Sequence, residues 1–213
     1  THTYRYDQPF RDGRGARVAN ARRLETFGSP VVGWVRVTVD PNDAELFRVT
    51  GLSNVDPTWS AAKILWVRKN QPEVFRKTAK FLLVEDYVTY RLTGRFASTP
   101  NLLSSTMFVD VHAGRYWPKI VDAVGVAGRL PEIVPSGAAV GTLTEAAAAE
   151  TGLARATVVV KGAMDQATSA VGAGNFLPGI ITETTGSVMA IGVTTPRIDF
   201  ASKVILPYQP HIV

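Results

Sequence analysis

A run of β-branched residues followed by a glycine turn and a single carboxylate constrains this chain more than any other feature. Residues 157–160 read Thr-Val-Val-Val and are followed by Gly162-Ala163-Met164-Asp165-Gln166. Small residues dominate the next ten positions. This order predicts a buried strand, a turn that exposes the Asp165 carboxylate, and a tightly packed helix.

A second turn, Thr184-Thr185-Gly186-Ser187, lies between two strand-like segments, 180–182 and 188–191. Such a turn presents backbone N–H groups to a phosphate. A lone carboxylate that faces a phosphate-binding turn is the minimal equipment for moving a phosphoryl group onto a hydroxyl. The alternative is that Asp165 only caps a helix and Gly186 only closes a hairpin, and spacing by itself favours neither.

Composition excludes several other classes of protein. With 213 residues, 46% of them hydrophobic, the chain can bury a sizeable core. It contains no cysteine and three histidines, which argues against disulfides, thiolate metal sites and a histidine-rich metal site. No apolar run approaches the roughly 18 residues of a membrane span. The start has no apolar core typical of a signal peptide, so we expect a soluble, cytoplasmic protein without membrane partners.

The net charge of +5 is concentrated at the start of the chain. Residues 1–23 hold six arginines against two aspartates, whereas the remainder carries 17 basic and 16 acidic residues. An arginine-rich arm can contact phosphates, but this one lacks regularly interleaved aromatic residues. We therefore expect residues 1–33 to form a solvated arm and predict no nucleic-acid partner.

Helices and strands are expected to alternate in the second half of the chain, which predicts an α/β fold. We expect a helix capped by Ser60 with Ile64, Leu65 and Val67 buried, and a helix that starts at Pro72. A third helix, 85–92, is expected to bury Tyr87, Val88 and Leu92 and to stop at Gly94. An antiparallel excursion is expected over 95–115, then helices over 117–124 and 145–151, the latter capped by Thr144 and ended by Gly152.

The order of several segments resembles the FGGY family of carbohydrate kinases, which phosphorylate sugars and polyols with ATP. The matching segments lie within residues 51–193 and are 63–72 (Lys-Ile-Leu-Trp-Val-Arg-Lys-Asn-Gln-Pro), 85–87 with 91–94 (Glu-Asp-Tyr…Arg-Leu-Thr-Gly), 104–110 with Trp117, 130–131 with 134–137, and 162–166. Each segment is unspecific alone, but their shared order makes the resemblance strong.

The resemblance implies a partial actin-like, ribonuclease-H-like ATPase domain, a mixed sheet with flanking helices, over residues 34–213. It places Asp165 at the family's general base and Gln166 at a contact to a sugar hydroxyl. Gly186 and Ser187 fall at the second phosphate loop, where serine replaces the usual threonine. ATP and Mg²⁺ are the implied cofactors, and no residue is assigned as a metal ligand.

Two further residues, Thr58 and Trp59, fall where the family lines its sugar pocket, although Trp59 is equally well explained by core packing. The family's opening Asp-x-Gly-Thr hairpin is missing before Trp34, and 34–37 read Trp-Val-Arg-Val where Trp-Asp-x-Arg is usual. No second, nucleotide-binding domain precedes Val213. We therefore expect a fragment of the full enzyme that is inactive on its own.

A ketopentose such as xylulose is the favoured substrate on overall likeness, with glycerol and other sugars left open. A homodimer is also compatible with the sequence. The alternative is an actin-like domain that binds nucleotide or protein without sugar chemistry. The pair Asp165-Gln166 argues against that alternative, because a non-catalytic relative has no need of it.

Overall fold

The computed structural model describes residues 44–52, 55, 57–185, 189–198 and 208–212, together with two short strands near the start. These strands, β1 (Thr3–Tyr4) and β2 (Arg17–Val18), pair antiparallel. The rest of the 1–33 arm, the segment 34–37 and the turn at Gly186 and Ser187 lie outside the described residues. The boundary between an arm and a kinase domain at residue 33 therefore stays a prediction.

The helices follow local sequence signals closely. They are α1 (Ala44–Thr50), α2 (Ser60–Asn70), α3 (Pro72–Lys77), α4 (Val84–Thr93), α5 (Pro100–Leu103), the 3-10 turn η1 (Ser104–Thr106), α6 (Pro118–Val124), α7 (Glu145–Thr151) and α8 (Asp165–Gly172). The Thr144 hydroxyl accepts a hydrogen bond from the Ala147 N–H and caps α7 as predicted. Gly94 and Gly152 end α4 and α7 in left-handed conformation, also as predicted.

The cap of α2 was predicted wrongly. Trp59 occupies the N-cap position and makes no side-chain cap bond, while Ser60 is the first helical residue. The predicted inner face is partly right: Ile64, Leu65 and Val67 are half-buried and pack against buried residues. The fully buried residues of α2 are Ala61, Ala62 and Trp66.

The strands of the described chain form five two-stranded sheets. β3 (Ala97–Ser98) pairs parallel with β6 (Glu132–Ile133). The other pairs are antiparallel: β4 (Val109–Asp110) with β5 (Arg115–Tyr116), β7 (Ala139–Thr142) with β8 (Val158–Val160), and β9 (Ile181–Thr185) with β10 (Met189–Val193). One of the five pairs is parallel and four are antiparallel, so the pairing is mixed, and helices lie between the strands along the chain.

The antiparallel excursion predicted over 95–115 is only partly present. β4 and β5 do form a hairpin, but β3 leaves it and joins β6 instead. Pro100 explains the break, because it starts α5 directly after β3 and turns the chain away.

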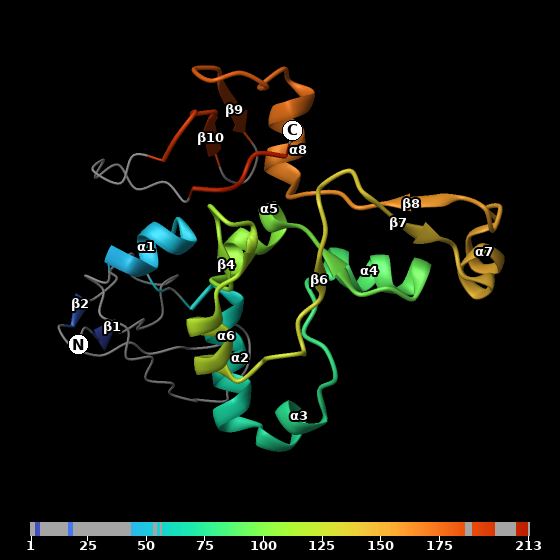
Figure 1. The fold of residues 1–213 in the computed structure, drawn as a ribbon, viewed down its shortest axis with the longest axis horizontal. Helices are drawn as coiled ribbons and strands as arrows, with labels where there is room; N and C mark the ends of the chain where they lie inside the picture. The colour runs from blue at the N-terminus through green and yellow to red at the C-terminus, as the bar shows by residue number, and fades with distance from the viewer. Residues whose placement is uncertain are drawn as a thin grey trace.

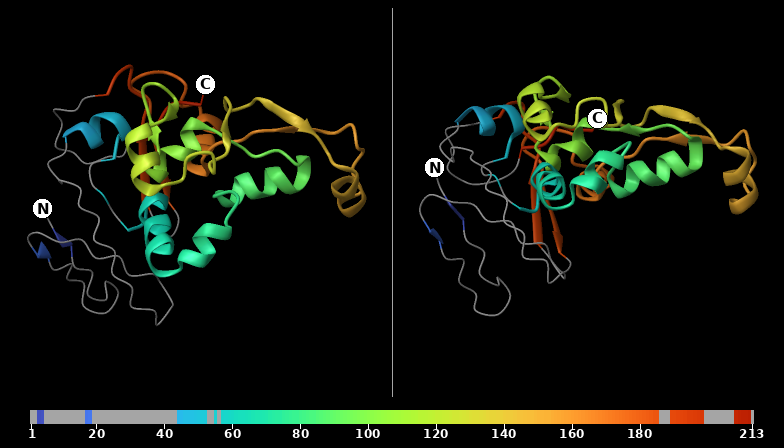
Figure 2. Two further views of the ribbon diagram at one scale, coloured as in Figure 1. Left: turned by 60° about the horizontal axis from the view of Figure 1, so that its bottom comes forward. Right: turned by 90° about the horizontal axis from the view of Figure 1, so that it is seen from below.

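The hydrophobic core lies between α1, α2, α6 and the strand β4 (Figure 1). Its buried members are Leu46, Leu52, Val55, Ala61, Met107, Phe108, Trp117, Val124 and Val126. β7, β8 and α7 project from this body in all the views, with α4 alongside (Figures 1 and 2). None of the described helices is long and apolar enough to cross a membrane.

Helix α4 buries a different face from the one predicted. Tyr87 and Val88 are about half exposed, whereas Asp86 and Thr89 are buried. The inward side is polar because it faces a buried cation, the ammonium group of Lys161. A charge taken out of water needs a charged partner, and this requirement overrides the apolar pattern.

The segments that flank Asp165 are less enclosed than predicted. Val158 and Val160 are each more than half exposed, and α8 has no buried residue. A Cβ placed on Gly172 would meet no atom within 4 Å. The cause is that β8 has β7 as its sole strand partner in the described chain. The predictions of a buried strand and a tightly packed helix are therefore wrong for this chain.

Candidate active site

Asp165 is the first residue of α8 and follows the four-residue turn that leaves β8. Both Asp165 and Gln166 are exposed, as the sequence predicted for the carboxylate. One oxygen of Asp165, Oδ1, accepts a hydrogen bond from the Gln166 N–H at 2.8 Å. The carboxylate thus lies at the N-terminal end of α8 and is held against the first turn of the helix by this bond.

Asp165 is not the residue that caps α8. The N-cap position belongs to Met164, whose side chain makes no cap bond. The Thr168 hydroxyl donates to the backbone carbonyl oxygens of Met164 and Asp165 and tightens the first turn. The Asp165 side chain is therefore oriented by the helix start while it remains open to a ligand.

The hairpin β9–β10 packs against α8, the helix that begins at Asp165 (Figure 1). Thr184 and Thr185, which were predicted to belong to the turn, are the last residues of β9. Thr185 and Met189 form the last residue pair before the turn. Asn175, which follows α8, donates from Nδ2 to the Thr182 hydroxyl at 3.1 Å and ties the helix to the hairpin. Gly186 and Ser187 lie in that turn, outside the described residues.

The other predicted sugar contacts come from a different element. Thr58 is exposed and Trp59 is half-buried, both just before α2. Trp59 packs against the hydrophobic core. Core packing is thus an observed role of Trp59, and a sugar contact at either residue stays a prediction.

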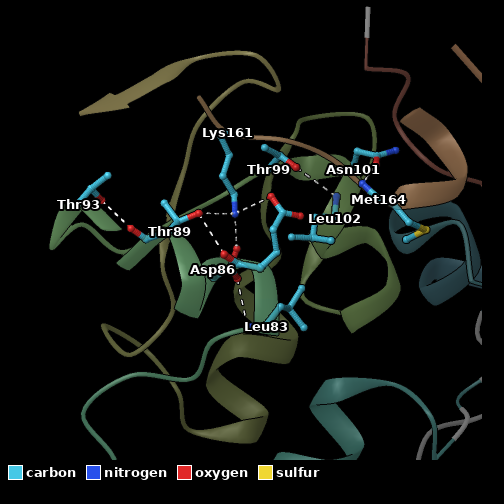
Figure 3. A network of polar contacts seen from close by, with 10 residues as sticks. Leu83, Asp86, Thr89, Thr93, Thr99, Asn101, Leu102, Lys161 and Met164 are labelled. Carbon is cyan, nitrogen blue, oxygen red and sulfur yellow. Dashed lines mark hydrogen bonds and ion pairs between the residues drawn. The ribbon is translucent and has the colours of Figure 1, made fainter. Parts of the chain in front are cut away.

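A buried ionic cluster lies directly upstream of Asp165 (Figure 3). The Lys161 Nζ atom lies 2.9 Å from Asp86 Oδ1, 2.9 Å from Glu85 Oε1 and 3.4 Å from the Thr89 hydroxyl. The side chains of Lys161 and Asp86 are fully buried, and that of Glu85 is 35% exposed. The second oxygen of Asp86 accepts the Leu83 N–H at the start of α4.

Asn101 holds the other end of the same turn. Its Oδ1 accepts the Met164 N–H at 2.9 Å, and its Nδ2 donates to the Pro210 carbonyl oxygen at 2.8 Å. Asn101 also borders a cleft of about 470 Å³ that Ser136 and His211 help to line. Asn101 therefore links the turn before Asp165 to the residues that line this cleft.

Tyr116 belongs to the surroundings of the ionic cluster. Its hydroxyl donates to the Pro131 carbonyl oxygen at 2.7 Å. Burial raises the pKa of the Tyr116 hydroxyl above its usual value, and the negative charge of Asp86 raises it further. Tyr116 is therefore a neutral hydrogen-bond donor at ordinary pH.

No group of three or more His, Cys, Asp or Glu side chains suited to a metal ion occurs among the described residues. Magnesium in phosphoryl-transfer sites is held by one or two carboxylates, waters and the phosphates of the nucleotide. Mg²⁺ bound together with ATP would therefore take most of its ligands from the nucleotide.

Sequence reasoning missed Lys161, and it quoted Asp86 only as part of a family motif. One signal was present: a lysine directly after three valines is an unusual end for an apolar strand. It indicates a buried or functional cation, but not which carboxylate neutralises it. Asn101 gave no signal, because asparagine next to proline is typical of ordinary turns.

The family model of the N-terminal domain of FGGY carbohydrate kinases matches residues 33–172, which include Asp165 and the whole ionic cluster. The chain therefore belongs to the FGGY family of carbohydrate kinases. Its fold is the actin-like α/β fold that the resemblance predicted, present in part.

Particular relatives agree with this assignment. The chain is 37% identical over 113 residues to the xylulose kinase of Bacillus subtilis (strain 168), which covers 53% of this chain and 23% of that protein. It is 32% identical over 113 residues to the L-fuculokinase of Salmonella typhi, covering 53% and 24%. The crystal structure of xylulose kinase from Rhodospirillum rubrum matches with a TM-score of 0.72 and 28% identity, covering 80% of this chain and 35% of that one. The chain thus spans about a quarter to a third of these relatives.

Proposed function

We propose that this chain is the sugar-binding part of an ATP-dependent kinase that transfers a phosphoryl group to a sugar or polyol hydroxyl. The observation that carries the proposal is the exposed Asp165 carboxylate at the start of α8, within the part of the chain that the family model matches. The hairpin β9–β10, packed on the same helix, supports it.

Asp165 acts as the general base in this proposal. A sugar hydroxyl is a weak nucleophile until its proton has an acceptor while the new O–P bond forms. The carboxylate oxygen that the Gln166 N–H leaves free takes this proton. The exposed Gln166 side chain orients the sugar by hydrogen bonding to a neighbouring hydroxyl. Because α8 fixes both residues, the base lies at a defined distance from the reacting oxygen.

Gly186 and Ser187 approach the transferred phosphate in this proposal, through backbone N–H groups of the turn between β9 and β10. Bound Mg²⁺ neutralises charge on the phosphates of ATP. Thr58 and Trp59 line the sugar pocket, where an aromatic face packs on the apolar side of a sugar ring.

Within the family we favour a ketopentose such as xylulose as the substrate. The support is that proteins named xylulose kinase occur both among the curated relatives and among the similar solved structures. The L-fuculokinase has a similar identity, which keeps other sugars in the test. We further propose that the protein is cytoplasmic and that residues 34–213 form its kinase part. A homodimer is compatible with this proposal.

The test is a coupled assay of ADP release by the complete natural polypeptide, with xylulose, fuculose and glycerol as alternative substrates. We expect release that depends on one sugar, and a kcat that falls about 10²–10⁴-fold in Asp165→Asn, because asparagine cannot accept the proton. Sugar affinity should be retained, since asparagine keeps the size and still hydrogen-bonds a hydroxyl.

Two outcomes would count against the proposal. A kcat of Asp165→Asn within about threefold of wild type would leave Asp165 with a structural role at the helix start, where asparagine serves equally well. Absence of sugar-dependent ADP release, combined with ATP binding, would favour a nucleotide-binding domain without sugar chemistry.

A further inference from the structure

The four residues from Lys161 to Met164 connect β8 to α8 and are held at both ends by buried side chains from other parts of the chain. Helix α4 supplies the partners of Lys161, and α5 supplies the partner of Met164. Asp165 follows immediately and is itself exposed. Its position therefore depends on the backbone of this turn and of the helix that it begins.

The first anchor is complete in its hydrogen bonding. An ammonium group has three N–H donors, and Lys161 finds three oxygen acceptors in Glu85, Asp86 and Thr89. The backbone of Lys161 is fixed as well, since its N–H donates to Ala138 and its carbonyl oxygen accepts from Gly137. Both the side chain and the backbone of Lys161 are thus held.

The glycine after Lys161 fits this close approach. A Cβ on Gly162 would lie 3.3 Å from Glu85 Oε1, tighter than an ordinary van der Waals contact. A side chain there would have to displace the Glu85 carboxylate by a few tenths of an ångström. Gly162 therefore leaves room for the contact between Glu85 and Lys161.

The second anchor acts on the residue next to the carboxylate. Asn101 is 2% exposed, and both ends of its amide are used, one by the Met164 N–H and one by the Pro210 carbonyl oxygen. The Met164 N–H has no acceptor from its own helix at this position, because the N-terminal N–H groups of a helix lack intrahelical partners. Asn101 supplies that acceptor and so fixes where α8 begins.

We propose that Lys161 and Asn101 are positioning residues for Asp165, acting from opposite ends of the turn. The proposal rests on the proposed function, in which Asp165 accepts the proton of the sugar hydroxyl. A displacement of about 1 Å in a reacting group can lower a rate by about 10²-fold. Ground-state sugar binding depends on other contacts and should change little, so the loss falls on kcat rather than KM.

The test compares variants of the complete natural polypeptide. Asn101→Ala removes the acceptor for Met164, whereas Asn101→Asp keeps an oxygen at that position. Lys161→Met combined with Asp86→Leu replaces the buried charge pair by apolar groups, which proteins often tolerate without loss of stability. The matched control is Lys119→Met, which breaks the surface ion pair with Glu45 far from the turn in sequence.

We expect kcat to fall about 10–100-fold in Asn101→Ala and in the Lys161/Asp86 double variant, with KM for the sugar within threefold of wild type. Asn101→Asp should recover part of the kcat lost in Asn101→Ala, because it restores the acceptor for Met164 but not the donor to Pro210. Lys119→Met should keep the wild-type value. Hydrogen exchange of the Met164 amide should accelerate at least tenfold in Asn101→Ala while the melting temperature stays within a few degrees.

The exchange measurement separates this proposal from the proposed function. One outcome is that the wild type phosphorylates no sugar while exchange of the Met164 amide still accelerates in Asn101→Ala. In that case Asn101 does hold the turn, and the kinase assignment fails. If Asp165→Asn abolishes activity while Asn101→Ala and the double variant both keep kcat within threefold, the positioning proposal is overturned and the kinase assignment stands. If neither Asn101→Ala nor the Lys161/Asp86 double variant folds, the positioning proposal is also overturned, because these residues would then have a structural role.

Discussion

The buried pair between Lys161 and Asp86 gives a prediction whose size follows from the structure. Replacing Lys161 by methionine keeps the length of the side chain and removes its charge. Asp86, which is fully buried, then loses the ammonium group 2.9 Å away. Glu85 loses the same partner at the same distance but is 35% exposed and can be solvated by water.

The size of the expected stability loss depends on two opposing terms, the attraction between the two charges and the cost of removing them from water. At 2.9 Å and an effective dielectric constant of about 20, the attraction of one such pair is about 6 kcal/mol. Desolvation of the two ions offsets several kcal/mol of this. Removal of one partner leaves the other charge buried without compensation, which typically costs about 3–5 kcal/mol. We therefore expect Lys161→Met to lower the free energy of unfolding by about that amount.

The assay is a double-mutant cycle by urea denaturation, with Lys161→Met, Asp86→Leu and the two combined. Each single change should be strongly destabilising, and the double variant should lie within about 1–2 kcal/mol of wild type, because no charge is then buried alone. Lys119→Met is the matched control and should change stability by less than about 1 kcal/mol, since its ion pair with Glu45 is exposed. A loss below about 1 kcal/mol in Lys161→Met would refute the reasoning.

Three further predictions concern other parts of the chain. Because burial raises the pKa of Tyr116, the folded protein keeps a phenol proton that the unfolded chain loses above a pH of about 10. Stability should therefore fall by up to about 1.4 kcal/mol per pH unit above that pH through this group, and Tyr116→Phe should remove that share of the slope. Thr144→Ala should cost about 1 kcal/mol by removing the cap of α7, and Thr144→Ser should restore most of it. The 213-residue chain by itself should release ADP at background only, since it spans about a third or less of its relatives, and clear sugar-dependent release would contradict this.

Features that depend on neighbours in sequence were predictable. The cap at Thr144, the stops at Gly94 and Gly152 and the start of α3 at Pro72 were all predicted correctly. Each depends on the conformational freedom or hydrogen bonding of one residue, and both are properties of the local chain. The exposure of Asp165 and the hairpin after α8 were also predicted from the sequence, because residues typical of turns precede Asp165 and separate the two strands.

Features that depend on distant partners were not predictable. The pairing of β3 with β6 joins segments more than 30 residues apart, and the sequence favoured a local hairpin instead. The inward face of α4 was misjudged for the same reason, since Asp86 is buried by a lysine 75 positions further along. Apolar periodicity describes burial against other apolar groups, whereas this face is buried against a charge, and only the folded chain brings that charge to it.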